Sequence, residues 1–395
     1  MTIPRQVDVV IVGGAAIGSA ATSFLAADPD FRGASLLVLE PDPAYAHCAT
    51  TRSVASIRHQ FSTPGNIRMS QFGTEFFRSA AQRLAVDGVV PDLAFREGGY
   101  LFLASEAGTD TLRRNFEVQR ACGADVAWLE PVALRQRFPW LRVDDLAAGV
   151  LGLSGEGWID AHSLLAALRR HAIAHGAVYR PVRAAALLRE GRRVVGVRLD
   201  DGTTVQAGHV INAAGTGAAE LARSVGVALP VESRRRCVFV LRTPGQLPAC
   251  PLLIDPGGVY IRPEGQGFLA GVAPPAPRDP PCSDFEVDHA LFDDIVWPAL
   301  AHRIPALEAL RVASAWAGHY DVNTFDQNLI LGPHPDLDGL LFANGLSGHG
   351  LQQSPAIGRA LSELVIHGTF RTLDLDAFGW RRVLDGRPLL ELNVV

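Results

Sequence analysis

The sequence predicts an α/β fold in which a domain built on parallel strands is interrupted by a second domain built on an antiparallel sheet. Three observations support this prediction. A strand–helix–strand pattern fills the first 40 residues, and a similar strand–glycine pattern returns near residues 210 and 340. Between them, from about residue 230 to 320, short β-rich runs alternate with proline-rich loops. A chain of 395 residues is long enough for two such domains.

The N-terminal pattern is typical of a βαβ unit. Val9–Val12 is a continuous β-branched run closed by glycine, which indicates a strand buried on both faces. Gly18–Ala27 is rich in small residues and predicts a helix. Leu36–Leu39 predicts a second buried strand, ended by Glu40-Pro41.

The middle of the chain continues in the same style. Ala161–His175 carries leucines on one helical face and predicts a helix. Val194–Leu199 and Thr203–Val205 flank the turn Asp200-Asp201-Gly202, which indicates a hairpin. We expect a further strand at Val210–Ala214, which runs into a glycine turn at Gly215.

The inserted part is predicted from three short strands, Cys237–Leu241, Gly258–Arg262 and Phe268–Val272, with the loop Pro274–Pro281. From Leu340 the pattern returns to strand, glycine turn and a helix from about Pro355. We therefore predict a discontinuous first domain and an inserted second domain. The first would comprise residues 1–90, 150–225 and 325–395, and the second residues 91–149 and 226–324.

Composition excludes several classes of protein. The net charge is −5 and the longest basic run is Arg234–Arg236, so no clustered basic footprint for nucleic acid is present. All 36 basic residues are arginine, so no lysine can act as a base or activate oxygen. Five cysteines without CxxC spacing argue against disulfides and a metal site, and fit a reducing cytosol. No apolar run has the length of a signal peptide or membrane span.

The glycine-rich turn Gly13–Gly18 follows the first strand and opens the first helix. This arrangement lets the backbone approach a pyrophosphate, which then lies at the helix N-terminus. Ala15 stands where such motifs usually carry their middle glycine, so a plain strand–helix turn is the alternative. Glu40 ends the second strand, where an acid can accept hydrogen bonds from ribose hydroxyls. Its alternative is a solvated acid at a strand end.

Two later segments fit a bound flavin dinucleotide. Val210–Gly215 resembles the strand and small-residue turn that return beneath such a cofactor, although any buried strand ending in glycine gives this pattern. Phe342–Leu351 carries glycines at 345, 348 and 350, which permit close approach to a flat ligand. The following helix would direct its positive end at a negative charge developing on a flavin. A tight strand–helix turn is the alternative.

Long stretches of the chain resemble the D-amino-acid oxidase and sarcosine oxidase superfamily of FAD-dependent oxidoreductases. Within it, they are most similar to the mitochondrial FAD-dependent oxidoreductase domain proteins of animals and their bacterial relatives. The resemblance spans nearly the whole chain. It is closest in Ser56–Ser62, in Ser314–Asp321 through Asn323–Asn328, and in Ser347–Gln353, and the last two of these stretches are long enough to be specific.

The resemblance implies a glutathione-reductase-like, FAD-binding Rossmann domain with an inserted antiparallel-sheet (α+β) substrate domain. It implies FAD in extended form, with the pyrophosphate at the first glycine turn, the ribose at the second strand end and the flavin at the later glycine loop. The implied FAD-binding positions are Gly13, Gly14, Ala15, Ala16, Ile17, Gly18, Glu40, Pro41, Thr51, Arg52, Ser53, Val182, Ala213, Ala214, Gly215, Gly318, Gly348, His349, Gly350, Leu351 and Gln352.

The resemblance also suggests which residues contact substrate. Arg58 matches the arginine that binds the substrate carboxylate in sarcosine oxidase, and a guanidinium suits that task through two parallel hydrogen bonds. Tyr260, Tyr320 and His349 are further candidates for the pocket. Each of these four residues also has a purely structural alternative.

Four positions depart from the family pattern. Gln352 and Leu269 stand where sarcosine oxidase carries its second carboxylate-binding lysine and its oxygen-activating lysine. Gly318 replaces the cysteine that links the flavin, and Ser53 stands where related dehydrogenases carry a linking histidine, so we expect noncovalent FAD. His47 and Cys48 keep a link open.

We therefore expect oxidation of the C–N bond of a small amine or N-alkyl amino acid by hydride transfer to flavin, giving an imine that hydrolyses. A dehydrogenase is favoured over an oxygen-using oxidase that releases H2O2, with O2, a quinone or an electron-transfer protein as the open acceptor. The alternatives are a flavin-binding assembly protein without turnover, as the animal relatives suggest, and a nicotinamide-dependent dehydrogenase. We expect a bacterial cytoplasmic protein without nucleic-acid partners.

Overall fold

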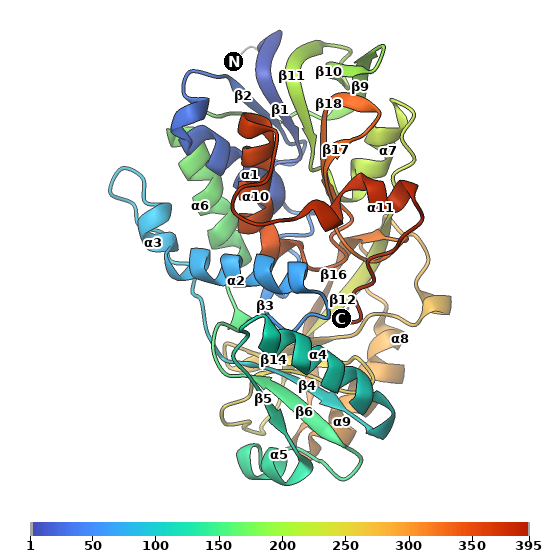
Figure 1. Ribbon diagram of the computed structural model, residues 1–395. Helices are drawn as coiled ribbons and strands as arrows, with labels where there is room; N and C mark the ends of the chain where they lie inside the picture. Colours follow the sequence, from blue (N-terminus) through green and yellow to red (C-terminus); the bar gives the residue numbers. More distant parts are fainter. Residues whose placement is uncertain (1–2, 394–395) are drawn as a thin grey trace.

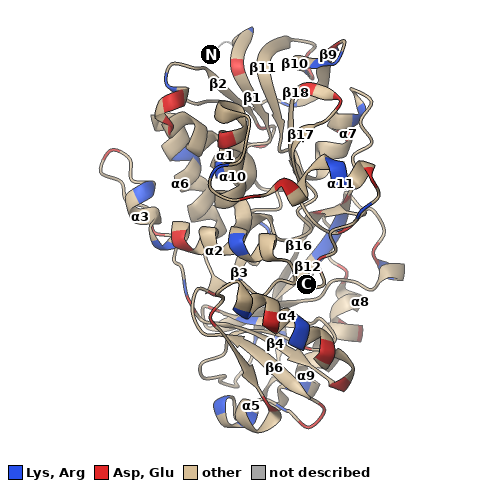
Figure 2. Ribbon diagram, in the orientation of Figure 1, with Lys and Arg blue, Asp and Glu red and all other residues tan. Residues whose placement is uncertain are grey.

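Two β-sheets, one above the other in Figure 1, organise the computed structural model, which describes residues 3–393. The first sheet contains both the N-terminal strand and the last strand of the chain. The second sheet is made from strands that lie between them in sequence. Basic and acidic residues are interspersed along the ribbon of both halves (Figure 2).

The first sheet has a parallel centre. β1 pairs in parallel with β2 and β11, β2 pairs with β8, and β11 pairs with β18. β17 is antiparallel to β18, and β9 and β10 extend the sheet as a hairpin. The strands are β1 Gln6–Val12, β2 Leu36–Leu39, β8 Val178–Arg180, β9 Ala184–Glu190, β10 Arg193–Leu199, β11 Thr204–Asn212, β17 Ile330–His334 and β18 Leu337–Asn344. Parallel strands bring their carboxyl ends to one edge, where ligands of open α/β sheets bind.

The central strands are buried on both faces, as the sequence predicts. Val9 and Ile11 face one apolar cluster with helices α1 (Ala16–Ala27) and α10 (Gly350–His367). Val10 and Val12 belong to a second cluster with the β9–β10 side of the sheet. Gly358 of α10 lies against α1, because a Cβ there would be 2.6 Å from the carbonyl carbon of Ala20. The two helices therefore pack with almost no side chain between them at that point.

Two predicted elements differ from the structure. The expected strands at residues 203–205 and 210–214 are one continuous strand, β11, which pairs with β10 in its first half and with β18 in its second. Helix α10 begins at Gly350 rather than near Pro355. Proline at 355 removes an N–H from the ladder, but Ser354 Oγ donates to the Leu351 carbonyl at 2.8 Å and satisfies it.

The second sheet is almost entirely antiparallel, with the order β16-β12-β15-β14-β13-β4-β6-β5. Only β13 and β4 pair in parallel. Its strands are β4 Tyr100–Ala104, β5 Val126–Leu129, β6 Ala148–Gly152, β12 Val231–Arg242, β13 Leu252–Ile254, β14 Tyr260–Glu264, β15 Gly267–Gly271 and β16 Arg311–Asn323. The three short strands predicted in this region correspond to parts of β12, β14 and β15.

Helices cover both sheets and the junction between them. The remaining helices are α2 Pro64–Arg78, α3 Ala80–Arg83, α4 Thr109–Ala121, α5 Pro131–Arg137, α6 Ala161–Ala174, α7 Ala218–Arg223, α8 His289–Leu291, α9 Trp297–Arg303 and α11 Trp380–Leu384. The short strands β3 (Ser56–Ile57) and β7 (Gly157–Trp158) pair antiparallel beside the junction. Across residues 3–393, no helix has the combined length and apolar character needed to span a membrane. The proposed domain boundaries remain a prediction.

Candidate active site

The Gly13–Gly18 turn requires glycine at both ends. Gly13 has φ +97°, and a Cβ there would lie 2.3 Å from the Ala213 carbonyl oxygen. A Cβ on Gly18 would lie 1.8 Å from the Gly13 carbonyl oxygen. Ala15 is the N-cap of α1 and makes no side-chain cap, so the N-cap residue does not occupy the first backbone N–H groups of the helix. Of these groups, the N–H of Ala16 donates to Thr50 Oγ1 at 3.2 Å.

Glu40 lies directly beside this turn. Its carboxylate accepts hydrogen bonds from the backbone N–H groups of Gly14 and Asp42, each at 2.9 Å. Burial raises the pKa of Glu40. The backbone N–H of Glu40 donates to the Arg180 carbonyl at 3.0 Å, and the N–H of Val182 donates to the same oxygen at 3.0 Å. The structure thus brings three expected cofactor positions, Gly14, Glu40 and Val182, to one edge of the first sheet. A fourth, Pro41, follows Glu40 and is exposed.

The Ala213–Gly215 turn completes this edge. The N–H of Ala213 donates to the Val12 carbonyl at 2.9 Å, which holds the ends of β11 and β1 together. The side chain of Asn212 fixes the turn, accepting from Ala214 N at 3.2 Å and donating to the Ala218 carbonyl at 3.0 Å. Gly215 has φ +53°, which favours glycine.

The segment Thr51–Ser53 is held against β16. Arg52 Nη1 donates to the Ala317 carbonyl at 2.7 Å, and Trp316 Nε1 donates to the Arg52 carbonyl at 2.8 Å. A Cβ on Gly318 would lie 3.0 Å from the Cβ of Arg52. The stem of Arg52 therefore occupies the space next to position 318. Thr51 Oγ1 donates to the Tyr45 carbonyl at 2.5 Å, and Ser53 Oγ accepts from Ala55 N at 3.1 Å.

The glycine loop before α10 is clamped by Asp321 of β16. Its carboxylate accepts from the N–H groups of Gly345 and Leu346 at 2.9 and 3.2 Å, and burial raises its pKa to about 6. Gly348 has φ +94°, and a Cβ there would lie 2.4 Å from Cε2 of Tyr320. The ring of Tyr320 therefore lies directly against the Gly348 backbone.

Arg58 is a buried cation at the junction of the two sheets. The residue is only 2% exposed, and its Nη2 atom contacts Nε2 of His349 at 3.2 Å. The guanidinium carbon lies 4.5, 5.8 and 5.4 Å from the ring centres of Phe61, Tyr100 and Phe102. Within residues 3–393, Nη1 has no hydrogen-bond partner. This is an unusual state for a buried guanidinium.

His349 is neutral in this environment. Burial, with a smaller contribution from the charge of Arg58, holds its pKa well below its usual value. Neutral imidazole can accept a hydrogen bond from Arg58 through Nε2 only if the proton is on Nδ1. Phe61 packs edge-on against His349, with ring centres 5.0 Å apart. His349 therefore orients Arg58 as an acceptor.

Tyr260 on β14 and Tyr320 on β16 both lie in the second sheet, with β12 and β15 between their strands. Burial raises the pKa of both hydroxyl groups. The charge of Tyr320 raises the pKa of Tyr260 further. A Cβ on Gly271 would lie 2.5 Å from the Tyr260 hydroxyl oxygen. Arg236 lies 5.2 Å above the Tyr320 ring and binds Asp279 through two hydrogen bonds of 2.7 and 3.0 Å.

The two positions where sarcosine oxidase carries lysines, 352 and 269, have other contacts in this protein. Gln352 Oε1 accepts from the backbone N–H of Arg58 at 2.8 Å, so this side chain holds the segment that carries Arg58. Leu269 is buried on β15 opposite Arg262 of β14. Arg262 Nε donates to the Val54 carbonyl at 3.0 Å, so a buried cation lies one strand away from Leu269.

Sequence reasoning missed Glu156, a fully buried acid next to Arg58. Its carboxylate accepts from the backbone N–H groups of His59 and Gln60 at 2.5 and 3.1 Å, and from Gln60 Nε2 at 2.7 Å. Burial raises its pKa to about 7, although the hydrogen bonds and the charge of Arg58 oppose the shift. The only sequence signal is an acid placed between two glycines, Gly155 and Gly157. Asn393 was also missed, although its carbonyl oxygen accepts from Arg58 Nη2.

The residues present fit an extended dinucleotide. Gly13, Gly18 and Gly348 each leave no space for a side chain, so these positions present only backbone. Asn344, at the end of β18, is fully buried, and within residues 3–393 neither of its amide atoms has a partner. A buried amide without partners is satisfied when a polar ligand group binds beside it.

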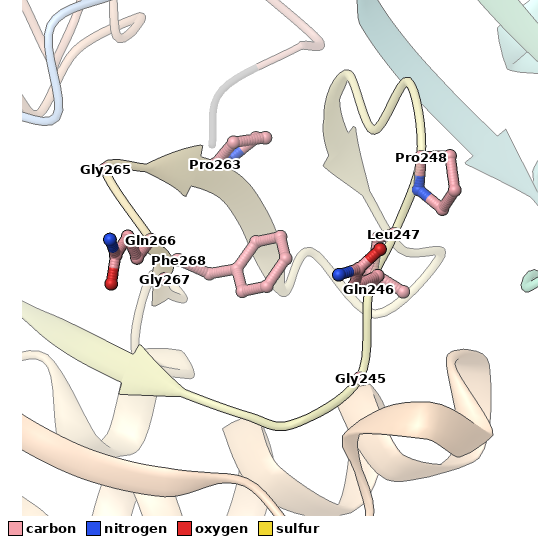
Figure 3. Close-up of a pocket in the computed structure, with 9 residues that line it drawn as sticks. All are labelled: Gly245, Gln246, Leu247, Pro248, Pro263, Gly265, Gln266, Gly267 and Phe268. Carbon is pink, nitrogen blue, oxygen red and sulfur yellow. The ribbon is translucent and has the colours of Figure 1, made fainter.

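A surface pocket elsewhere carries no such groups. It is lined by the loops 245–248 and 263–268 at one end of the second sheet (Figure 3). None of its nine lining residues is charged or titratable, and they include none of the expected site residues.

Comparisons with known proteins agree with this geometry. The chain matches the family described as "DAO: FAD dependent oxidoreductase" over residues 8–364. It is 41% identical, over 99% of its length and 85% of the relative, to the FAD-dependent oxidoreductase domain-containing protein 1 of Xenopus laevis. Because this relative is an animal protein, it does not support the bacterial origin expected from the sequence.

Two solved structures have the same fold. L-proline dehydrogenase from P. horikoshii superposes with a TM-score of 0.86 at 23% identity, over 98% of this chain and 100% of that one. Glycine oxidase from Geobacillus kaustophilus gives 0.80 at 25% identity, over 95% and 98%. The expected fold class and the FAD cofactor are thereby confirmed. The chain belongs to the DAO family of FAD-dependent oxidoreductases.

Proposed function

We propose that this protein oxidises the C–N bond of a small amino acid, preferably an N-alkylated one, and that Arg58 binds the substrate carboxylate. The observation that carries the proposal is the buried Arg58 guanidinium, whose Nη1 has no partner within residues 3–393. A substrate carboxylate would supply the missing anion through two charge-assisted hydrogen bonds. The relatives described above include enzymes named for proline and glycine, two small amino acids.

FAD, when bound, supplies the acceptor for a hydride from the carbon next to the substrate nitrogen, and the imine so formed is hydrolysed. The expected positions from Gly13–Gly18, Glu40, Val182 and Ala213–Gly215 would hold the dinucleotide. Those at Thr51–Ser53, Gly318 and Gly348–Gln352 would hold the flavin. Noncovalent attachment remains part of this proposal.

The protein's own contribution is position and a dry pocket. Neutral His349 accepts from Arg58 and fixes its orientation, while Gln352 holds the backbone of the same residue. The partly buried rings of Tyr260 and Tyr320 would form the pocket wall that excludes water. Holding the reacting groups in one geometry is the larger part of catalysis in such reactions.

We also propose that the enzyme acts as a dehydrogenase with an acceptor other than oxygen. Leu269 is apolar where a cation would stabilise superoxide, and the nearby Arg262 is held by Val54 and by Glu264. The protein would work in the cytoplasm on a small molecule, without a nucleic-acid partner.

The test is an anaerobic screen of N-methyl, cyclic and simple amino acids, followed by loss of the visible flavin absorbance. Bleaching by a carboxylate-bearing amine, and not by the matching amine without a carboxylate, is the expected result. A protein that no amine bleaches would instead be a flavin-binding protein without turnover. Admitting air then separates the two modes, because rapid recovery of absorbance would identify an oxidase.

A further inference from the structure

The last part of the described chain crosses from the first sheet to the junction. We call residues 389–393 the strap segment. After α11 the red chain in Figure 1 descends towards α4. Its first residue, Leu389, donates its N–H to Asp326 Oδ2 at 3.0 Å and accepts from Asn328 Nδ2 at 2.6 Å. Asp326 is itself held by the buried guanidinium of Arg382, so the segment starts from a rigid point.

Glu391 is a second, buried anchor. The residue is 5% exposed, and its carboxylate accepts from Ser62 N at 2.7 Å, Thr63 Oγ1 at 3.0 Å and Asn66 Nδ2 at 2.9 Å. These donors lie at the start of α2, where a carboxylate is favoured by the helix dipole. Three hydrogen bonds to one buried carboxylate fix the strap segment at this residue.

Beyond Glu391 the attachment reaches the candidate substrate site. The carbonyl oxygen of Asn393 accepts from Arg58 Nη2. Its side-chain amide donates to the Gln60 carbonyl at 3.1 Å and accepts from Asn115 Nδ2 of α4 at 2.9 Å. The N–H of Leu392 donates to Ser62 Oγ at 2.9 Å.

The hydrogen bonds of Leu392 and Asn393 can be replaced by bonds to water or to a ligand. The side chains of Leu390 and Leu392 are each 57% exposed, so apolar burial does not hold the segment down. Asn393 makes two bonds to charged groups: its N–H donates to Glu391 Oε1 at 3.1 Å, and its carbonyl accepts from Arg58 Nη2. Its side-chain bonds to Gln60 and Asn115 are between neutral groups. A neutral carbonyl is a weaker partner for a guanidinium than a carboxylate, which binds through two shorter, charge-assisted bonds.

We propose that the strap segment is part of the substrate site and that Asn393 competes with the substrate carboxylate for Arg58. In the closed arrangement the Asn393 carbonyl holds Nη2. A ligand carboxylate takes both Nη1 and Nη2, and residues 392–393 swing away while Glu391 stays anchored. This inference rests on the proposed role of Arg58, and it makes substrate affinity depend on a residue 335 positions away in sequence.

Two truncations of the holoenzyme test the proposal with opposite signs. A chain ended after Glu391 lacks the competing carbonyl, so acetate, used as the carboxylate probe, should bind about tenfold more tightly, as a 1.4 kcal/mol competitor would require. A chain ended after Asn393 places a terminal carboxylate beside Arg58, so acetate should bind several-fold more weakly. Dissociation constants come from the change in visible flavin absorbance.

The outcomes separate this inference from the proposed function. If Arg58→Lys weakens acetate binding but ending the chain after Glu391 leaves it unchanged or weaker, the strap proposal is wrong and the role of Arg58 stands. If acetate perturbs neither the full chain nor the chain ended after Glu391, the carboxylate site itself is wrong and the competition proposal falls with it. Hydrogen exchange then still reports the contact, because Arg58→Lys should lower protection at Leu392 and Asn393 but not at Leu389.

Discussion

The guanidinium of Arg58 meets the imidazole of His349 at 3.2 Å, although the two residues are 291 positions apart. Because burial and the arginine charge keep the pKa of His349 low, the pair is an arginine with a neutral acceptor and not a repelling pair of cations. The aromatic faces of Phe61, Tyr100 and Phe102 surround the same guanidinium. The guanidinium thus makes its direct contacts with an imidazole, a backbone carbonyl and aromatic rings, and this arrangement is prepared for an anionic ligand.

Replacing Arg58 with lysine should weaken carboxylate binding by about ten- to a hundredfold, because an ammonium cannot form two parallel bonds or stack on the rings. The effect should fall on KM more than on kcat. Steady-state kinetics with the best substrate of the amine screen measures both. Arg83→Lys is the matched control, since Arg83 lies 5.9 Å above the Phe76 ring but outside the junction. Equal effects of the two substitutions would contradict the assignment.

Replacing Gly18 with alanine should weaken FAD binding at least tenfold, about 1.4 kcal/mol. The added Cβ would lie 1.8 Å from the Gly13 carbonyl oxygen, so the turn must open. The ratio of flavin to protein after gel filtration measures the loss. Gly257→Ala is the control, because a Cβ there meets only Asp255 Oδ2 at 3.7 Å. A Gly18→Ala protein with full flavin content would show that this turn does not contact the cofactor.

Glu156 should make folding stability fall as the pH rises towards neutrality. Its pKa is raised from 4.5 to about 7 in the folded protein, so the folded state holds the proton more tightly than the unfolded state. The stabilisation is complete below pH 4.5 and is lost as the pH rises through 7. Relative to Glu156→Gln, the wild type should therefore lose up to about 3 kcal/mol across that range. Paired urea unfolding curves at several pH values test this, and a constant difference would refute it.

The nucleotide half of the fold was predictable because its signals are local. A β-branched run, a glycine turn and a small-residue helix lie next to one another in Val9–Ala27, and β1 and α1 follow that pattern. The region 91–149 gave no strand prediction. Strands β4 and β6 pair with each other across 44 positions or more, and β4 also pairs with β13. Such long-range pairing leaves little trace in local periodicity.

The residues of the candidate site also fall into those with a local sequence signal and those without one. Glycine positions such as Gly13 and Gly18 are readable because the turn geometry demands them wherever they occur. Arg58 was proposed only through family resemblance, since an isolated arginine carries no local signal. Glu156 and Asn393 were missed because their contacts with residues 58–60 join segments 97 and 335 positions apart. Only the folded chain brings these groups together.

Acid precipitation should release the flavin into the supernatant. Gly318 has no side chain that could form a bond, and a Cβ at that position would already lie 3.0 Å from the Cβ of Arg52. The thiol nearest in sequence to the flavin-side segment Thr51–Ser53 is Cys48, whose Sγ contacts Thr51 Oγ1 at 3.4 Å. The measurement compares flavin absorbance in the pellet and the supernatant for the wild type and for Cys48→Ser. Colour that stays in the wild-type pellet and leaves the Cys48→Ser pellet would replace the noncovalent assignment with a link through Cys48. Colour in both pellets would direct the search to His47, which lies 3.4 Å from Arg52 Nη2 through its Nδ1 atom.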